Sequence, residues 1–322
     1  MDSGCTDGLK RLVGRSCGFW SYRLAAENLQ EFCGIDLSHT TVGDLAQKIA
    51  DEITEKLPDR IDLRNDFQEA KGDVEFFVDG TCINTRNAEN QALWREMKVG
   101  VIDKRPGGDS ATPSQWDSRE LPEPSIVFAF AAIENKEEFQ KRCQSEARRL
   151  GVSNVSSALG DGAAWVWNIV REVFGKTDEC LDIYHALEHV ASCGKVLYGS
   201  GQAFTDWLDR MRMVLLSEGF SGMDRELSSL LVSGGLHPSG GVAVKSLHKY
   251  LDNNRERLNY CERLASGRAI GSGQVEGACK NLVGRRLKQT GACWRLERVN
   301  RLAVICALLY SNQWRPYWKN SP

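Results

Sequence analysis

Three acidic residues lie in sequence contexts that could bring their carboxylates to one site. Asp79 ends the apolar run FFVD, Asp161 lies between two glycines in LGDGAAW, and Glu276 follows the Gly/Ser-rich segment GSGQV. A charge in apolar surroundings needs compensation, and a metal ion can supply it. Carboxylate oxygens suit Mg²⁺ or Mn²⁺, and a pair of such ions promotes phosphodiester transfer. These residues are therefore candidate metal ligands and catalytic groups of a two-metal site.

Each of the three acids also has a structural explanation. An aspartate after a strand often forms a turn or caps a helix, and a glutamate in the first turn of a helix interacts favourably with the helix dipole. The glycines around Asp161 allow a tight turn that points its carboxylate outward. The functional interpretation depends on the three residues meeting in one fold.

The segment HALEH at 185–189 is a competing motif. His185 and His189 are one helical turn apart and flank Glu188, which is the H-x-x-E-H pattern of a class of zinc peptidases. Such a site needs a third ligand, for which Glu218 or Glu226 is a candidate. This interpretation leaves the three acidic motifs unexplained. If HALEH is not a zinc site, His185 could contact DNA or orient a neighbouring residue. Alternatively, the histidines have only a structural role.

The elements that must position these residues change along the chain. Strands are expected at VEFFVDGTCI, WREMKVGVI, SIVFAFAAI, VSSAL and around CLDIYH, with helices at 135–150 and 163–174. Three strands followed by helix, strand, helix and strand predict a mixed α/β sheet, and this is also the element order of the ribonuclease H fold. Helical patterns follow at 185–198, 202–218, 223–232, 242–258, 274–288 and 296–310.

These patterns predict three regions. Residues 1–65 form a helical N-terminal region, in which 22–33 and 38–49 are either two packed helices or a helix-turn-helix DNA reader. Residues 70–185 plus 270–315 form the α/β core, and 186–269 form an all-helical insertion.

Basic residues are concentrated near the C-terminus. From Arg263 to Lys319 there are eleven Lys or Arg and two Glu, or 11 − 2 = +9, although the whole chain carries −2. Such asymmetry predicts a basic face for a polyanion. The alternative is that these basic residues lie on the solvent-exposed faces of a helix pair and bind no polyanion. The tryptophans at 165, 167 and 294 either stack on a base or, as we favour, belong to the core. Candidate phosphate-binding residues are Lys280, Arg285, Arg286, Lys288 and Arg295.

Composition excludes several classes of protein. The chain has no apolar run of about 18 residues that would span a membrane, and its start lacks the pattern of a signal peptide. Eleven cysteines without a CxxC pair indicate free thiols in the reducing cytosol and no structural zinc site. The expected location is cytoplasmic, in association with the nucleoid.

The successive motifs resemble those of the ISKra-type insertion-sequence transposases. The resemblance is carried, in order, by VDGTCINTR, WREMKVGVI, LGDGAAWVWNI, DIYHALEH and GSGQVEGACKNLVGRRLKQTGACW, and it extends over roughly 21–318. The last motif is the most specific of the five. Relatives usually carry a longer segment before SYRLAAENL, so a truncated reading frame is also an expectation.

The resemblance implies a DDE transposase with a ribonuclease-H-like core. Asp79, Asp161 and Glu276 would be its metal-binding triad, with Asp79 bridging two Mg²⁺ or Mn²⁺ ions, and a helical insertion would separate Asp161 from Glu276. The implied partners are element ends, target DNA and further copies of the chain. A non-catalytic DNA-binding protein derived from a transposase is the alternative, although all three acids are intact.

Overall fold

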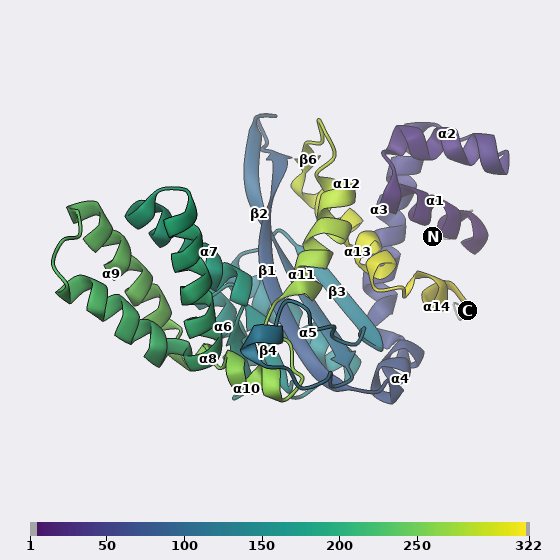
Figure 1. Ribbon diagram of the computed structural model, residues 1–322. Helices are drawn as coiled ribbons and strands as arrows, with labels where there is room; N and C mark the ends of the chain where they lie inside the picture. Colours follow the sequence, from purple (N-terminus) through teal and green to yellow (C-terminus); the bar gives the residue numbers. More distant parts are fainter. Residues whose placement is uncertain (1–4, 320–322) are drawn as a thin grey trace.

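The computed structural model describes residues 5–319. They form one mixed β-sheet with helices around it (Figure 1). The sheet order is β3-β2-β1-β4-β5, and β6 also pairs with β1. The pairs β1–β2 and β2–β3 are antiparallel, whereas β1–β4, β4–β5 and β1–β6 are parallel. The strands are β1 (Asp73–Arg86), β2 (Ala92–Arg105), β3 (Ile126–Ala132), β4 (Ser157–Gly160), β5 (Asp178–Leu181) and β6 (Trp294–Arg295). The predicted mixed α/β class is confirmed.

The last predicted strand is shorter than expected. The sequence CLDIYH suggested a strand through His185, but β5 ends at Leu181 and a helix begins at Ile183. Asp182 ends the strand because its carboxylate accepts hydrogen bonds from the N–H groups of Tyr184 (2.6 Å) and His185 (3.2 Å), as a helix N-cap residue does.

Helices surround the sheet and extend from it on both sides in Figure 1. They are α1 (Asp7–Phe19), α2 (Tyr22–Cys33), α3 (His39–Lys56), α4 (Ile61–Glu69), α5 (Lys136–Leu150), α6 (Ala164–Phe174), α7 (Ile183–Tyr198), α8 (Gln202–Val232), α9 (Pro238–Asn253), α10 (Tyr260–Ala265), α11 (Gly273–Ala278), α12 (Arg285–Leu287), α13 (Leu296–Tyr310) and α14 (Trp314–Lys319). A π-helical segment, Cys279–Gly284, joins α11 to α12. Within the described chain, no helix is both long and apolar enough to cross a bilayer.

The two faces of the sheet carry different helices. Successive side chains of a strand point to opposite faces, so Phe76 and Asp79 of β1 face opposite ways. Phe76 packs against Phe174 of α6, with ring centroids 5.0 Å apart. Asp79 faces the π-helical segment, where it contacts Cys279. The candidate site therefore lies on the face of β1 that α11 covers and α6 does not.

The N-terminal helices form one packed group with α13. Helix α3 packs against α1, α2 and α13, and its Asp44 and Asp51 pair with Arg298 (3.1 Å) and Arg301 (2.6 Å) of α13. A DNA-reading helix would present free cations or polar groups to the groove. The contacts of α3 instead favour the packed-helix alternative for this region.

Residues 183–265 are mainly helical. Helices α7, α8, α9 and α10 follow one another, and α8 bends at Gly219, between the two helices expected from the sequence. Helices α7, α8 and α9 lie beyond the β4–β5 side of the sheet, at the left in Figure 1, and α10 lies at the bottom, below β4. All eleven cysteines are unpaired, as predicted.

Candidate active site

Asp79 lies where one edge of β1 is left open. On that edge β1 pairs with β4 over 75–78 and with β6 over 85–86. In the described part of the chain, 79–84 has no strand partner on this side. The Asp79 carboxylate accepts hydrogen bonds from the Gly80 N–H (2.7 Å) and the Cys279 thiol (3.7 Å). The edge of β1 is therefore open between β4 and β6 at the point where Asp79 leaves the strand.

Asp161 follows the strand that pairs with this part of β1. Val78 is in register with Gly160, so the next residues, Asp79 and Asp161, emerge from adjacent parallel strands. The Asp161 carboxylate accepts a hydrogen bond from the Ala163 N–H (2.9 Å). Gly162 has a φ of 88°, which an L side chain rarely adopts. The predicted tight turn is confirmed.

Asp161 is close enough to Asp79 to affect the pKa of the Asp79 carboxyl. Burial is the largest cause that raises the pKa of the Asp79 carboxyl, and the charge of Asp161 raises it further. The Gly80 N–H, His185 and the Cys279 thiol act in the opposite direction. Two carboxylates that share a site resist joint ionisation, and a bound cation would relieve their repulsion.

Glu276 is brought toward the aspartate pair by helix α11. Helix α11 packs against β1 and β2, and Glu276 and Cys279 are three residues apart, on one face of this helical segment. Burial raises the pKa of the Cys279 thiol to about 12, with further contributions from Asp79 and Glu276. The Glu276 carboxylate itself lies 3.6 Å from Lys280 Nζ. Cys279 therefore lies between the aspartate pair and Glu276.

The three carboxylates do not form a closed coordination shell. Within residues 5–319, no group of three or more His, Cys, Asp or Glu side chains is arranged to hold a metal ion. The donor types of the aspartate pair nevertheless fit the expected Mg²⁺ or Mn²⁺, since both supply carboxylate oxygens and Asp161 disfavours the charge of Asp79. Glu276 would have to leave Lys280 to join them.

Asp182 links the two helices that border this site. Its side chain is fully buried. It accepts hydrogen bonds from the Ser272 N–H (2.5 Å) and hydroxyl as well as from the first turn of α7. Ile183 N–H also donates to the Ile270 carbonyl (3.0 Å). The start of α7, which carries His185, is thereby fixed to the segment that leads into α11 and Glu276.

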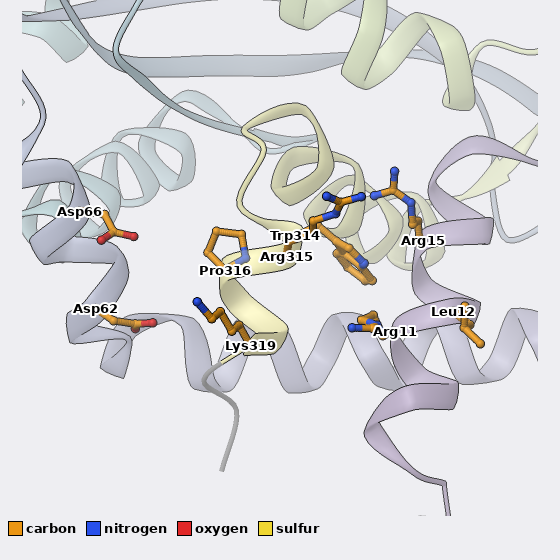
Figure 2. Close-up of a pocket in the computed structure, with 9 residues that line it drawn as sticks. All are labelled: Arg11, Leu12, Arg15, Asp62, Asp66, Trp314, Arg315, Pro316 and Lys319. Atoms are coloured by element: carbon orange, nitrogen blue, oxygen red, sulfur yellow. The ribbon is translucent and has the colours of Figure 1, made fainter.

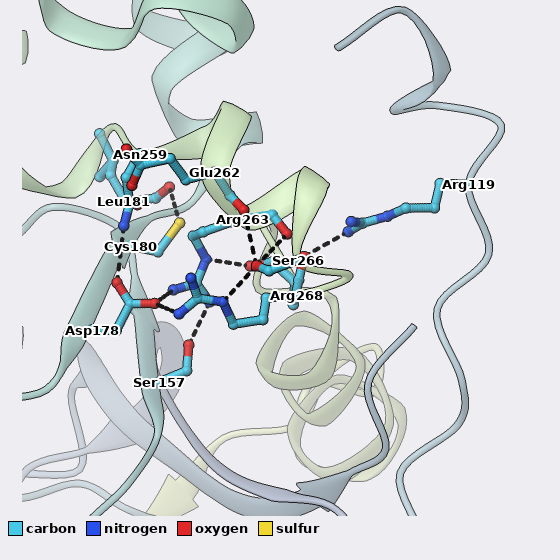
Figure 3. A network of polar contacts seen from close by, with 11 residues as sticks. Arg119, Ser157, Asp178, Cys180, Leu181, Asn259, Glu262, Arg263, Ser266 and Arg268 are labelled. Atoms are coloured by element: carbon cyan, nitrogen blue, oxygen red, sulfur yellow. Dashed lines mark hydrogen bonds and ion pairs between the residues drawn. The ribbon is translucent and has the colours of Figure 1, made fainter. Parts of the chain in front are cut away.

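A buried arginine anchors the other end of that segment (Figure 3). Arg263 of α10 is fully buried and donates hydrogen bonds to the Ala269 carbonyl (2.7 Å), to Asp178 and to Ser157. Arg268 points at the same Asp178 carboxylate. The segment 266–272 is therefore held to the N-terminal ends of β4 and β5 by this cluster, and to the C-terminal end of β5 by Asp182.

The two histidines of HALEH have different surroundings. His185 lies near the aspartates, since its charge lowers the pKa of Asp79, and its Nδ1 is 3.5 Å from Glu188. The ring of His189 stacks on Tyr250, with centroids 3.7 Å apart. Burial, then the charge of His185, lower the pKa of His189. Tyr250 donates a hydrogen bond to the Asp161 carbonyl (3.3 Å), so His189 supports the turn that carries Asp161.

The third ligands considered for a zinc site are paired elsewhere. Glu218 pairs with Arg225 and Glu226 with Arg210, each at 2.8 Å. Both glutamates belong to α8.

Part of the C-terminal basic charge is used inside the protein. Arg263 and Arg268 pair with Asp178, and Arg298 and Arg301 pair with α3, as described above. Arg286 was expected to bind phosphate, but its side chain is only 2% exposed. It donates to the Cys17 carbonyl (2.7 Å) and lies over the ring of Trp294 at 4.9 Å. The prediction for Arg286 was therefore wrong, because a buried guanidinium cannot reach DNA.

The other candidate phosphate-binding residues are exposed: Lys280, Arg285, Lys288 and Arg295. Lys288 donates a hydrogen bond to the Thr81 hydroxyl, two residues after Asp79 on β1. Trp167 is 2% exposed and Trp165 packs edge-on against Phe139, so the preference for core aromatics is confirmed for both.

Several residues of the site escaped the sequence patterns. Asp182, Ser272 and Cys279 lie within the quoted motifs but were not singled out as functional residues, and Tyr250 lies in none of these motifs. No protein-family profile matches the chain, and no curated protein matches it at a significant level.

Proposed function

We propose that this chain is a DNA strand transferase of the ISKra transposase type, built on a ribonuclease-H-like core. The observation that carries the proposal is the proximity of Asp79, in β1 directly after its pairing with β4, to Asp161, directly after the end of β4. The order of strands and helices supports the proposed core. Four exposed cations around α11 and α12 supply charges that suit a phosphate backbone.

The residues of the site have separate tasks in this proposal. Asp79 and Asp161 hold divalent cations through their carboxylate oxygens, and Glu276 leaves Lys280 to join them. Bound Mg²⁺ or Mn²⁺ would activate the attacking hydroxyl and stabilise the leaving oxygen. Lys288 and Lys280 orient the DNA strand through its phosphates. His185, held by the N-cap at Asp182, moderates the charge around Asp79.

The reaction would proceed in two transfers. Water attacks the phosphodiester at an element end and frees a 3′-hydroxyl, and that hydroxyl then attacks a phosphodiester of the target DNA. In each transfer one P–O bond forms as the P–O3′ bond breaks, and the leaving 3′-oxygen keeps the electron pair. No covalent bond between the protein and DNA is required. Self-association is expected, since two DNA ends must be brought together.

The test is cleavage of a labelled duplex that carries the inverted repeat flanking the reading frame. We expect Mn²⁺-dependent nicking by the wild-type protein and a loss of at least about 100-fold in Asp161→Asn and Glu276→Gln, since each removes a charged ligand. Glu297→Gln is the matched control, because Glu297 is exposed on α13. Equal nicking by all four proteins would overturn the assignment of the site.

The alternatives give different results in the same preparation. A zinc peptidase would cleave a casein substrate, and it would lose this activity with a zinc chelator and in His185→Ala. A protein that only binds DNA would shift the duplex in a gel and would be indifferent to Mn²⁺ and to both acidic substitutions.

A further inference from the structure

A second basic site lies away from the carboxylates, between the two ends of the chain. A pocket of about 830 Å³ is bordered by α1, α4 and α14. Its basic side chains are Arg11, Arg15, Arg315 and Lys319, and its acidic ones are Asp62 and Asp66 of α4. Figure 1 places α1 and α14 on the opposite side of the molecule from α7. This pocket is therefore distinct from the candidate active site.

The arginines of this pocket lack acidic partners. Within residues 5–319, Arg11, Arg15 and Arg315 form no ion pair with a carboxylate. Figure 2 shows the guanidinium groups of Arg15 and Arg315 pointing toward one another. Like charges in this arrangement repel each other, and an anion between them converts the repulsion into two attractions. Asp62 of this pocket pairs with Arg60 at 2.6 Å.

The pocket is built by tight packing of its helices. Trp314 is 2% exposed and packs on α1 at Gly14, where a Cβ atom would lie 2.5 Å from the indole ring. Arg60 donates hydrogen bonds to the carbonyls of Pro316 (3.0 Å) and Tyr317 (2.5 Å). These contacts fix the backbone of α14 on both sides of Arg315. The backbone positions of Arg15 and Arg315 are therefore set by the packing of α14 on α1 and by Arg60.

A basic track joins this pocket to the region near the carboxylates. Arg15 lies over the ring of Phe19 at 5.6 Å, and Arg285 lies over the same ring at 5.7 Å. Lys288, three residues further on, reaches Thr81 on β1. The cations thus extend from the edge of β1 across Phe19 to Arg15 and Arg315. A polyanion with regularly spaced charges fits such a track better than a single small anion does.

We propose that this pocket binds the phosphate backbone of DNA at a distance from the carboxylates, with Arg15 and Arg315 as its central contacts. This inference rests on the proposed function for the identity of the polyanion. The pocket would give the protein a second DNA-binding site. A duplex with one strand at the carboxylates would then also be bound at the pocket, on the other side of Phe19. The contacts are to phosphates and are independent of base sequence.

The test is the salt dependence of binding to a fluorescein-labelled duplex of mixed sequence, measured by anisotropy. Each lost phosphate contact lowers the log–log salt slope by about 0.9. We therefore expect the slope of Arg15→Ala/Arg315→Ala to be lower by about 1.8. Between about 50 and 200 mM salt, the wild-type protein should lose about twelvefold more affinity than this variant. The matched control is Lys141→Ala/Arg148→Ala, which removes two exposed cations of α5.

Each outcome decides the inference. A wild-type slope in the arginine variant, or an equal loss in the α5 control, overturns the pocket assignment but leaves the proposed function standing. If the arginine variant shows the expected change in salt slope but the wild-type protein shows no Mn²⁺-dependent nicking, the pocket assignment stands and the strand-transfer proposal is overturned. Binding of a labelled polyglutamate peptide that is lost in the arginine variant, with duplex binding unchanged, would assign the pocket to an acidic protein segment instead. Unchanged circular dichroism of both variants shows that folding is intact.

Discussion

The buried carboxylate of Asp182 accepts two hydrogen bonds from Ser272, one from its backbone N–H at 2.5 Å and one from its hydroxyl. Ninety residues of chain separate the two. The contact joins the start of α7 to the segment before α11, so that His185 and Glu276 are placed by one side chain. Its removal should therefore affect both folding and the site.

Asp182→Asn should lower the free energy of unfolding by about 3 kcal/mol, because an amide nitrogen in place of one oxygen leaves buried donors unpaired. Urea denaturation followed by circular dichroism measures the loss. Asp36→Asn is the control, since Asp36 is exposed. A difference between the two variants of less than about 0.5 kcal/mol would contradict a structural role for Asp182.

Removing one charge of the aspartate pair should stabilise the protein when no divalent cation is bound. The folded state raises the pKa of Asp79, through burial first and then through Asp161. The ionised carboxyl therefore destabilises the fold above its pKa, and this cost disappears as the pH falls through the usual aspartate range near about 4. Asp161→Asn removes part of the cost, so its Tm at neutral pH should exceed that of the wild type by about 2 °C.

Mn²⁺ should reverse this order, because a ligand that binds only the folded state stabilises it. Calorimetry with increasing Mn²⁺ should raise the Tm of the wild type more than that of Asp161→Asn. The same rise in both proteins would argue against a cation at the aspartate pair. Glu297→Gln serves again as the control and should follow the wild type.

Neighbouring arginines on α12 should behave in opposite ways. Arg286 is buried against Cys17 and Trp294, so Arg286→Met should change stability while leaving the salt slope of DNA binding unaltered. Arg285 is exposed, so Arg285→Met should lower that slope by about 0.9 and leave the Tm within about 1 °C of the wild type. The reverse assignment of effects would contradict the burial of Arg286.

The thiol of Cys279 should react slowly with iodoacetamide. Burial raises its pKa to about 12, and the thiolate is the reactive form. At about pH 8 its thiolate fraction is then on the order of 10⁻⁴. Peptide mass spectrometry should find Cys33, Cys82 and Cys261, which are exposed, alkylated well before Cys279. Early alkylation of Cys279 would show that its contact with Asp79 is not maintained in solution.

The sequence was informative about elements because local patterns reflect local physics. Apolar runs predicted four strands within a few residues of their ends, and the glycine of LGDG marked the turn at Gly162, whose φ of 88° excludes most side chains. The strand expected through CLDIYH was wrong at its end, because Asp182 caps a helix there. Periodicity does not distinguish a short apolar strand from a buried first helical turn.

Long-range contacts were decided only by the tertiary structure. Residue type alone made Arg285 and Arg286 equivalent cations, but packing against Cys17 buries one and leaves the other on the surface. The presence of Arg15 and Arg315 in one pocket likewise depends on Trp314 packing against Gly14. Charge and periodicity belong to the sequence, whereas the partner of each charge depends on which distant segments the core brings together.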